Sequence, residues 1–135
     1  MQKVKSALEQ NGHKVKMPPI EIRDGEGHMI PVLEYYAMRK RASEQDTWIW
    51  ERKAEAIQWH FDKVAWSDAV LITNYEKNNI PGYIGGNTLM EMGIAFFLKK
   101  PIYLLHQIPE LSYKEEVLGM KPIVLNGDLE NINTV

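Results

Sequence analysis

The chain has 135 residues with no cysteine, 44% hydrophobic and 25% charged residues, and a formal net charge of -2. These values are typical of one globular domain over residues 1–135, and they exclude disulfides, thiolate metal sites and catalysis by a thiol. Because no basic patch, signal-peptide core or apolar run of about 18 residues is present, we expect a cytoplasmic protein that binds neither nucleic acid nor a membrane.

The first segments of the chain predict a helix, a strand and a loop. Apolar residues recur at helical spacing over residues 3–11, and Asn11-Gly12 supplies a helix stop. Residues 13–17 alternate ahead of two prolines, which cannot extend a ladder, so a short strand is expected there. Residues 20–31 contain two glycines and are expected to form a loop.

A long charged segment follows. Residues 33–67 contain no proline or glycine, and Ile57, Phe61 and Val64 form an apolar stripe at helical spacing. One long helix or two shorter ones fit this pattern. Residues 69–73, AVLIT, then form a short apolar run rich in β-branched residues, which predicts a strand buried on both faces.

The remaining chain alternates strands with helices. A glycine-rich loop leads into a predicted helix that ends at Lys99-Lys100, because positive charges are favourable at a helix C-terminus. Strands are expected at 101–105 and 122–125, with a short helix at 113–119 between them. This alternation predicts an α/β fold, a doubly wound, flavodoxin- or Rossmann-like parallel sheet with helices on both faces. Because the chain opens with a helix, the usual first strand of such a sheet is missing from the expected elements.

Ligands of such sheets bind beyond the carboxyl ends of the strands. Two expected strands end close to Asn74 and His106, and the glycine-rich loop lies beside them. We therefore expect these two residues to line a small-molecule site together with members of the loop, namely Tyr83, Gly85, Gly86 and Asn87. The four histidines are scattered and no carboxylate cluster accompanies them, so no metal or other cofactor is expected.

The loop and helix at residues 82–96 read GYIGGNTLMEMGIAF and carry one carboxylate, Glu91. In one interpretation Thr88 and Glu91 form a capping box that starts the helix, and the glutamate is structural. In the other, Glu91 lies in the first helical turn, where the helix dipole favours its ionised, nucleophilic form. Spacing alone favours the capping box.

Residues 67–105 read SDAVLITNYEKNNIPGYIGGNTLMEMGIAFFLKKPIYLL. This run resembles the nucleoside 2-deoxyribosyltransferase-like superfamily, in which a strand ending near an Asn is followed by a Gly-rich loop, a helix with Glu-x-Gly-x-Ala and a Lys-Pro-led strand. The resemblance implies that Glu91 is the nucleophile that attacks the anomeric carbon of a deoxyribosyl group and displaces the base. Such a reaction passes through an oxocarbenium-like state, which a nearby carboxylate stabilises.

A second group must protonate the departing base. In the family this group is an Asp, and the equivalent position here falls near His60, with Asp62 two residues further on. His60 can act as a general acid near neutral pH, or it can be a packed or capping histidine. Asp62 can act only in a different local register, because residues two apart on a helix do not share a face.

The expected function is cleavage or transfer at the N-glycosidic bond of a (deoxy)nucleoside or nucleoside 5′-monophosphate through Glu91. The alternative is a non-catalytic nucleotide-binding module of the same fold, which the histidine in place of Asp and the missing strand favour. The resemblance also implies a homo-oligomer, because family members complete each site with a polar residue of a neighbouring subunit. The nearest position here is Glu116.

Overall fold

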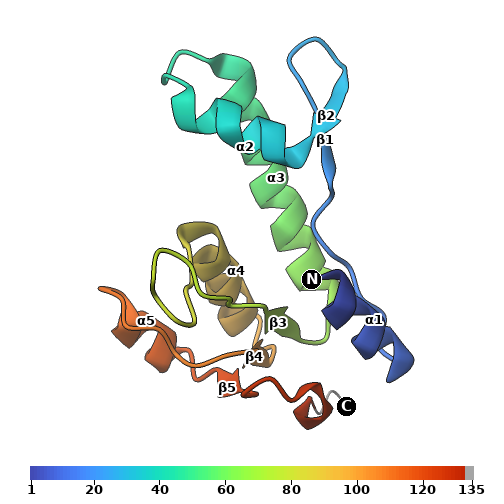
Figure 1. Cartoon of the computed structure of the whole chain (residues 1–135), viewed down its shortest axis with the longest axis vertical. Helices are drawn as coiled ribbons and strands as arrows, with labels where there is room; N and C mark the ends of the chain where they lie inside the picture. The colour runs from blue at the N-terminus through green and yellow to red at the C-terminus, as the bar shows by residue number, and fades with distance from the viewer. Residues whose placement is uncertain (133–135) are drawn as a thin grey trace. The chain divides into compact units, whose positions relative to one another are not determined.

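The structure is a computed structural model, and it describes residues 1–132. Its backbone contacts divide the chain into two compact units. Unit 1 consists of Met1–Val15 and Phe61–Val135, and unit 2 of Lys16–His60 (Figure 1). No described helix has both the length and the apolar character that crossing a membrane requires. The single domain expected over residues 1–135 stays a prediction.

Unit 1 contains a three-stranded parallel sheet in the order β3-β4-β5. The strands and the helices that connect them are β3 (Val70–Ile72), α4 (Gly86–Phe97), β4 (Ile102–Leu104), α5 (Lys114–Gly119) and β5 (Ile123–Val124). Each helix links two parallel neighbours, as a βαβ unit requires. The predicted α/β fold with a parallel sheet is therefore confirmed, whereas the doubly wound arrangement with helices on both faces stays a prediction.

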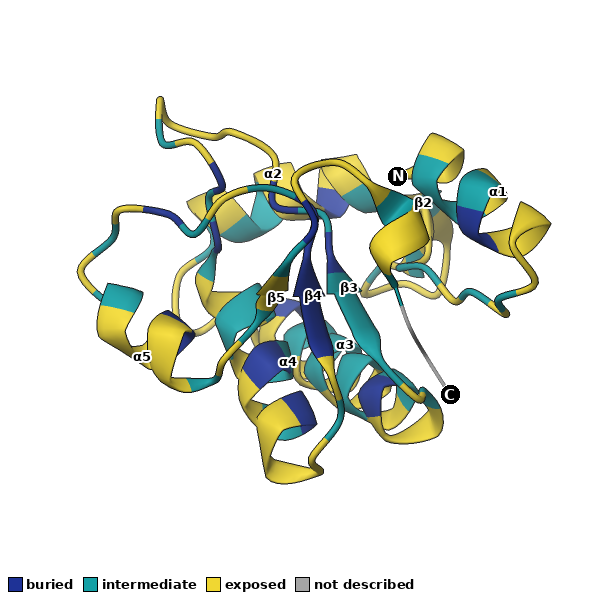
Figure 2. Ribbon diagram, turned by 90° about the horizontal axis from the view of Figure 1, so that it is seen from below, coloured by how far each residue is buried: buried dark blue, intermediate teal, exposed yellow. Residues whose placement is uncertain are grey.

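The central strand β4 is buried along its whole length, as Figure 2 shows in dark blue. In contrast, β3 pairs only with β4 among the described residues, through bonds such as that from the Val70 N–H to the Pro101 carbonyl at 3.0 Å. Val70 and Leu71 are half-buried, and only Ile72 is buried. Full burial of this strand, expected from its apolar residues, is wrong because β3 lies at an edge of the sheet.

The core of unit 1 forms where α4 packs against β3 and β4. Its buried members are Val64, Ile72, Ile84, Met92, Ala95, Ile102, Leu104 and Val117. Met92 and Ala95 lie one turn apart on α4 and are both fully buried, so they mark the face that the helix turns toward the sheet. Burial of a side chain such as Met92 contributes about 1.5–3 kcal/mol. This packing fixes α4 relative to the strand ends.

The predicted N-terminal helix is confirmed as α1 (Gln2–Gln10). Its C-cap is Asn11, and the following Gly12 has a φ of +89°. The strand predicted over residues 13–17 is wrong, because the described chain offers this segment no neighbouring strand to form a ladder. The alternation of residues 13–17 and the prolines after them reflect only the local preference of this segment for an extended conformation. A β-strand also needs a neighbouring strand to which it can hydrogen-bond.

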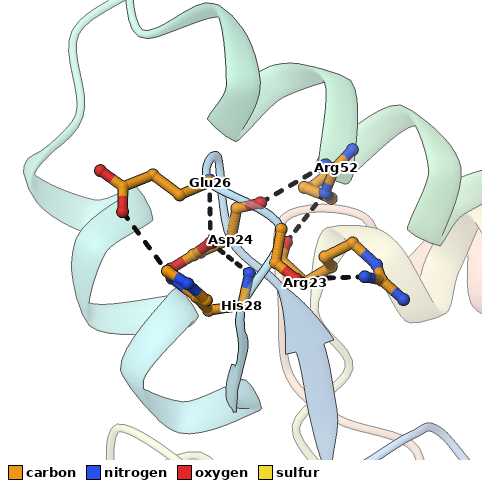
Figure 3. A network of polar contacts seen from close by, with 6 residues as sticks. Arg23, Asp24, Glu26, His28 and Arg52 are labelled. Carbon is orange, nitrogen blue, oxygen red and sulfur yellow. Dashed lines mark hydrogen bonds and ion pairs between the residues drawn. The ribbon is translucent and has the colours of Figure 1, made fainter.

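Unit 2 begins with an antiparallel hairpin of β1 (Glu21–Arg23) and β2 (Met29–Pro31). The loop expected over residues 20–31 is therefore wrong. Each strand has only three residues, too few for alternation to be visible. The Asp24 carboxylate accepts hydrogen bonds from the backbone N–H of Glu26 at 2.9 Å and of His28 at 2.8 Å, which closes the turn (Figure 3).

Two helices follow, α2 (Val32–Arg41) and α3 (Thr47–Trp66). Of the two predictions for residues 33–67, that of two shorter helices is therefore confirmed. Within unit 2 the α3 residue Arg52 donates from Nε to the carbonyl oxygen of Arg23 at 2.8 Å (Figure 3). The Trp48 ring lies against Gly25, where an added Cβ would approach its Cγ to 2.9 Å. These contacts hold the hairpin turn on α3.

Candidate functional site

The carboxyl ends of β3 and β4 are joined by the side chain of Asn74, which is 2% exposed. Its Nδ2 donates to the carbonyl oxygens of His106 at 3.1 Å and Gln107 at 3.0 Å, and its Oδ1 accepts the His106 N–H at 2.8 Å. A further contact of Nδ2 with the Gly82 carbonyl at 3.3 Å reaches the loop before α4. The amide of Asn74 therefore positions two strand ends and a loop, and its predicted place in a small-molecule site stays a prediction.

Gly82 is the point where this loop passes close to the segment after β4. Its φ is +72°, a value that favours glycine, and a Cβ built there would overlap with the carbonyl oxygen of Gln107. The loop between Asn74 and Gly82 is exposed and turns at Asn78 and Asn79, whose φ values are +53° and +61°. Gly82 is thus required by the fold, whatever the site binds.

The four loop residues named above lie directly before α4 or in its first turn. The Lys77 Nζ lies 5.7 Å from the centre of the Tyr83 ring, and Tyr83 Cε1 would lie 3.6 Å from a Cβ at Gly85. A Cβ at Gly86 would meet no described heavy atom within 4 Å, and neither glycine has a positive φ. Neither glycine is therefore needed for backbone conformation, and Gly86 leaves the backbone at the helix start uncovered, whereas the Tyr83 ring lies beside Gly85.

The capping box at Thr88 and Glu91 is wrong. Helix α4 starts at Gly86 with Gly85 as its N-cap and no side-chain cap, and the Leu89 N–H donates to the Gly85 carbonyl at 2.9 Å. Thr88 is consequently inside the helix, where it cannot be the N-cap residue. Glu91 is correspondingly in the second turn, so its expected place in the first turn, next to the positive end of the dipole, is also wrong.

Glu91 is the only charged residue of α4, and its side chain is half-buried. It lies about 100° around the helix from the buried Met92, at the border of the face that packs on the sheet. Asn87 precedes it by one turn on the same side of the helix. A carboxylate at the edge of an apolar core is disfavoured unless it is paired or serves a function.

The two proposed proton donors lie on α3. His60 is half-buried and its ring makes a T-shaped contact with the Trp59 ring, with centres 5.0 Å apart, whereas Asp62 is exposed. His60 is the last residue of unit 2, and Asp62 belongs to unit 1. The pairing of either side chain with Glu91 stays a prediction.

Two further aromatic residues belong to this region. The rings of Tyr75 and His106 lie 5.5 Å apart between centres, tilted by 53°, at adjacent strand ends. Tyr113 donates from its hydroxyl to the Ile84 carbonyl, and burial raises the pKa of this phenol, with a smaller contribution from Tyr83. The sequence signal for Tyr75 was its place directly after Asn74, whereas nothing in the sequence connected Tyr113 with the loop 29 residues earlier.

No protein-family model, curated protein or solved structure matches the chain. The resemblance to the nucleoside 2-deoxyribosyltransferase-like superfamily therefore stays an expectation. Within residues 1–132, no three His, Asp or Glu side chains gather in a group that could hold a metal ion. The structure places three features near the carboxyl ends of β3 and β4. They are a loop held by Asn74, the start of α4 at Gly86 and the half-buried carboxylate of Glu91.

Proposed function

We propose that the chain cleaves or transfers at the N-glycosidic bond of a (deoxy)nucleoside or nucleoside 5′-monophosphate, with Glu91 as the nucleophile. The observation that carries this proposal is the position of Glu91. It is the only charge on a helix that directly follows a loop anchored at the carboxyl ends of two parallel strands. Sites of α/β proteins lie at such strand ends. The proposal includes a doubly wound fold.

In the proposed reaction, a carboxylate oxygen of Glu91 forms a bond to the anomeric carbon while the N-glycosidic bond breaks. The base leaves with the electron pair of that bond and takes a proton from an acid, for which His60 and Asp62 are the candidates. Water or a second base then attacks the anomeric carbon, its proton passes to the side chain that protonated the first base, and the Glu91 carboxylate is released. Water yields hydrolysis, and a second base yields transfer.

The loop supports this chemistry through its shape. Asn74 and Gly82 hold it close to the end of β4, and Gly85 and Gly86 place no side chain over the start of α4. Backbone N–H groups of the first helical turn have no partner within their own helix, so a sugar hydroxyl or a 5′-phosphate suits them. Tyr83 and Asn87 border the same stretch of chain.

The test is base release from a panel of deoxynucleosides, ribonucleosides and their 5′-monophosphates, followed by chromatography with and without an acceptor base. We expect Glu91→Ala to lower the rate by roughly 10³-fold or more, the scale on which loss of a nucleophile acts in other hydrolases. Glu115→Gln, an exposed glutamate of α5, is the matched control and should keep the rate. Azide should restore base release to Glu91→Ala by attacking the anomeric carbon in place of the carboxylate.

Unchanged base release in Glu91→Ala would contradict the assignment. If the wild-type protein binds nucleotides in calorimetry but releases no base from any member of the panel, the alternative of a non-catalytic nucleotide-binding module replaces it. His60→Gln and Asp62→Asn, made separately, identify the acid, because loss of a general acid typically lowers a rate by about 10²–10⁴-fold.

A homo-oligomer also belongs to the proposal. Glu116 is exposed on α5, near the position from which family members contribute a polar residue of another type to the site of a neighbouring subunit. Light scattering coupled to size-exclusion chromatography measures the assembly directly, and a strictly monomeric mass in the presence of full activity would remove this part of the proposal.

A further inference from the structure

Tyr75 and His106 form a ring pair at the carboxyl ends of β3 and β4. Their ring centres lie 5.5 Å apart at an interplanar angle of 53°, within the range of favourable aromatic contacts. Tyr75 is nevertheless 46% exposed, and His106 is partly exposed. The pair therefore keeps a large aromatic surface accessible beyond the carboxyl ends of the strands, where ligands of α/β sheets bind.

The backbone beneath this pair is held from both sides. Asn74 directly precedes Tyr75, and its buried amide both donates to the His106 carbonyl and accepts from the His106 N–H. The Tyr75 N–H donates to the Thr73 carbonyl at 2.9 Å, which fixes the turn after β3. Both rings consequently extend from a rigid support, and a rigid site loses less conformational entropy when a ligand binds.

The polar atoms of the two rings are available as well. Across residues 1–132, neither the Tyr75 hydroxyl nor the His106 imidazole makes a hydrogen bond to the protein. Tyr113 shows the contrasting case, since its hydroxyl donates to the Ile84 carbonyl and its burial raises the pKa of the phenol. Tyr113 is used in the fold, whereas Tyr75 has polar and aromatic surface that the fold does not use.

We propose that the Tyr75–His106 pair is the platform that binds the nucleobase. The heterocycle stacks on the Tyr75 ring, and the His106 imidazole, which carries one donor and one acceptor when neutral, forms hydrogen bonds to its ring nitrogens or amino group. A sugar has no π face, so it gains less from this stacking than a heterocycle does. The inference rests on the proposed function, because it assigns the base end of the same substrate whose anomeric carbon meets Glu91.

The platform predicts that free bases bind without any chemical step. Adenine and cytosine are titrated into the full chain by calorimetry, with 2-deoxyribose as the probe that lacks a heterocycle. Stacking of one base on an aromatic side chain is worth about 1–3 kcal/mol, so Tyr75→Leu should weaken binding of both bases roughly tenfold or more. Tyr75→Phe keeps the ring and should stay within about twofold, since the hydroxyl adds at most a neutral hydrogen bond.

Two further variants complete the set. His106→Phe keeps an aromatic ring but removes the donor and acceptor, so a loss of about five-fold is expected from one neutral hydrogen bond. Tyr36→Leu is the matched control, because Tyr36 is a 37% exposed tyrosine of α2. This variant should bind both bases as tightly as the wild type. Circular dichroism and urea unfolding confirm that each variant is folded before its affinity is compared.

The proposal is overturned if folded Tyr75→Leu binds adenine and cytosine as tightly as the wild type, or if the wild type binds neither base at millimolar concentration. The same experiments distinguish failure of the base platform from failure of the proposed glycosidic reaction. Tyr75-dependent base binding without any base release removes the glycosidic reaction and leaves the platform. Base release with full affinity in Tyr75→Leu removes the platform and leaves the reaction.

Discussion

The side-chain Nδ2 of Asn74 lies 3.3 Å from the carbonyl oxygen of Gly82, across a loop that begins at the end of β3 and ends at the start of α4. The same nitrogen reaches the carbonyl oxygens of His106 and Gln107, and Gly82 in turn approaches the Gln107 carbonyl too closely for any side chain. These two residues therefore determine where the loop, the Tyr75–His106 pair and the first turn of α4 lie in unit 1.

Gly82→Ala should destabilise the protein strongly. The new Cβ would overlap with the Gln107 carbonyl oxygen, and the φ of +72° adds a cost of about 1–2 kcal/mol for a residue with a Cβ. We expect the free energy of unfolding in urea to fall by about 3 kcal/mol or more. Gly127→Ala is the matched control, because its φ is +81° but nothing lies within 4 Å of its Cβ. Equal losses in the two variants would show that the contact with Gln107 is unimportant.

Asn74→Asp should be more harmful than Asn74→Ala at neutral pH. The carboxylate would face three carbonyl oxygens in a buried site, a repulsion that raises its folded-state pKa above the unfolded value. A raised acid pKa means that stability is present below the unfolded pKa and is lost as the pH rises. We therefore expect the Asp variant to be less stable than the Ala variant at pH 7 and the gap to shrink toward pH 4, measured by urea unfolding. A gap that is constant with pH would contradict this placement of the side chain.

Lys99→Gly should stabilise the protein. Helix α4 ends with Leu98 as its C-cap, and the N–H groups of Lys99 and Lys100 donate to the carbonyls of Phe96 at 3.0 Å and Ala95 at 2.9 Å. This pairing is a Schellman motif, whose left-handed position is usually a glycine, and here Lys99 occupies it with a φ of +60°. Relief of this strain exceeds the added backbone entropy of the unfolded chain, so a gain of about 0.5–1 kcal/mol is expected.

The neighbouring substitution Leu98→Gly is the control for Lys99→Gly. It adds the same backbone freedom at a φ of -82°, where no strain is relieved, so it should lower the free energy of unfolding. If urea unfolding gave both glycine variants the same sign, the left-handed conformation of Lys99 would not be the cause.

The hairpin turn of unit 2 should loosen in acid. The His28 N–H, which donates to the Asp24 carboxylate, lowers the pKa of that carboxyl. A lowered acid pKa means that the stabilisation is present above the unfolded value and is lost as the pH falls through the folded value. Exchange of the Glu26 and His28 amide hydrogens, corrected for its intrinsic pH dependence, should therefore become faster over that range. In Asp24→Asn the corrected exchange should not change with pH, and an identical acid response in both proteins would contradict the role of Asp24.

Several elements followed from the sequence because their signals are local. The β-branched run that became β3, the apolar run that became β4 and the helical spacing ahead of Asn11-Gly12 each reflect preferences of neighbouring residues. The hairpin at residues 21–31 was missed because three-residue strands are too short to alternate visibly. The strand expected at residues 13–17 failed for the opposite reason, since a suitable pattern found no partner strand in the described chain.

The features of the candidate site also fall into those that follow from neighbouring residues and those that depend on contacts between distant ones. The sequence by itself determined that a glycine-rich loop joins a strand to an apolar helix carrying Glu91 as its only charge, because these features are adjacent in the chain. Only the tertiary structure decided that α4 starts at Gly86, that Asn74 is a buried link to His106 and Gln107, and that Tyr75 meets His106. Those contacts join residues more than 30 positions apart, and they exist because parallel pairing of β3 with β4 brings their carboxyl ends together.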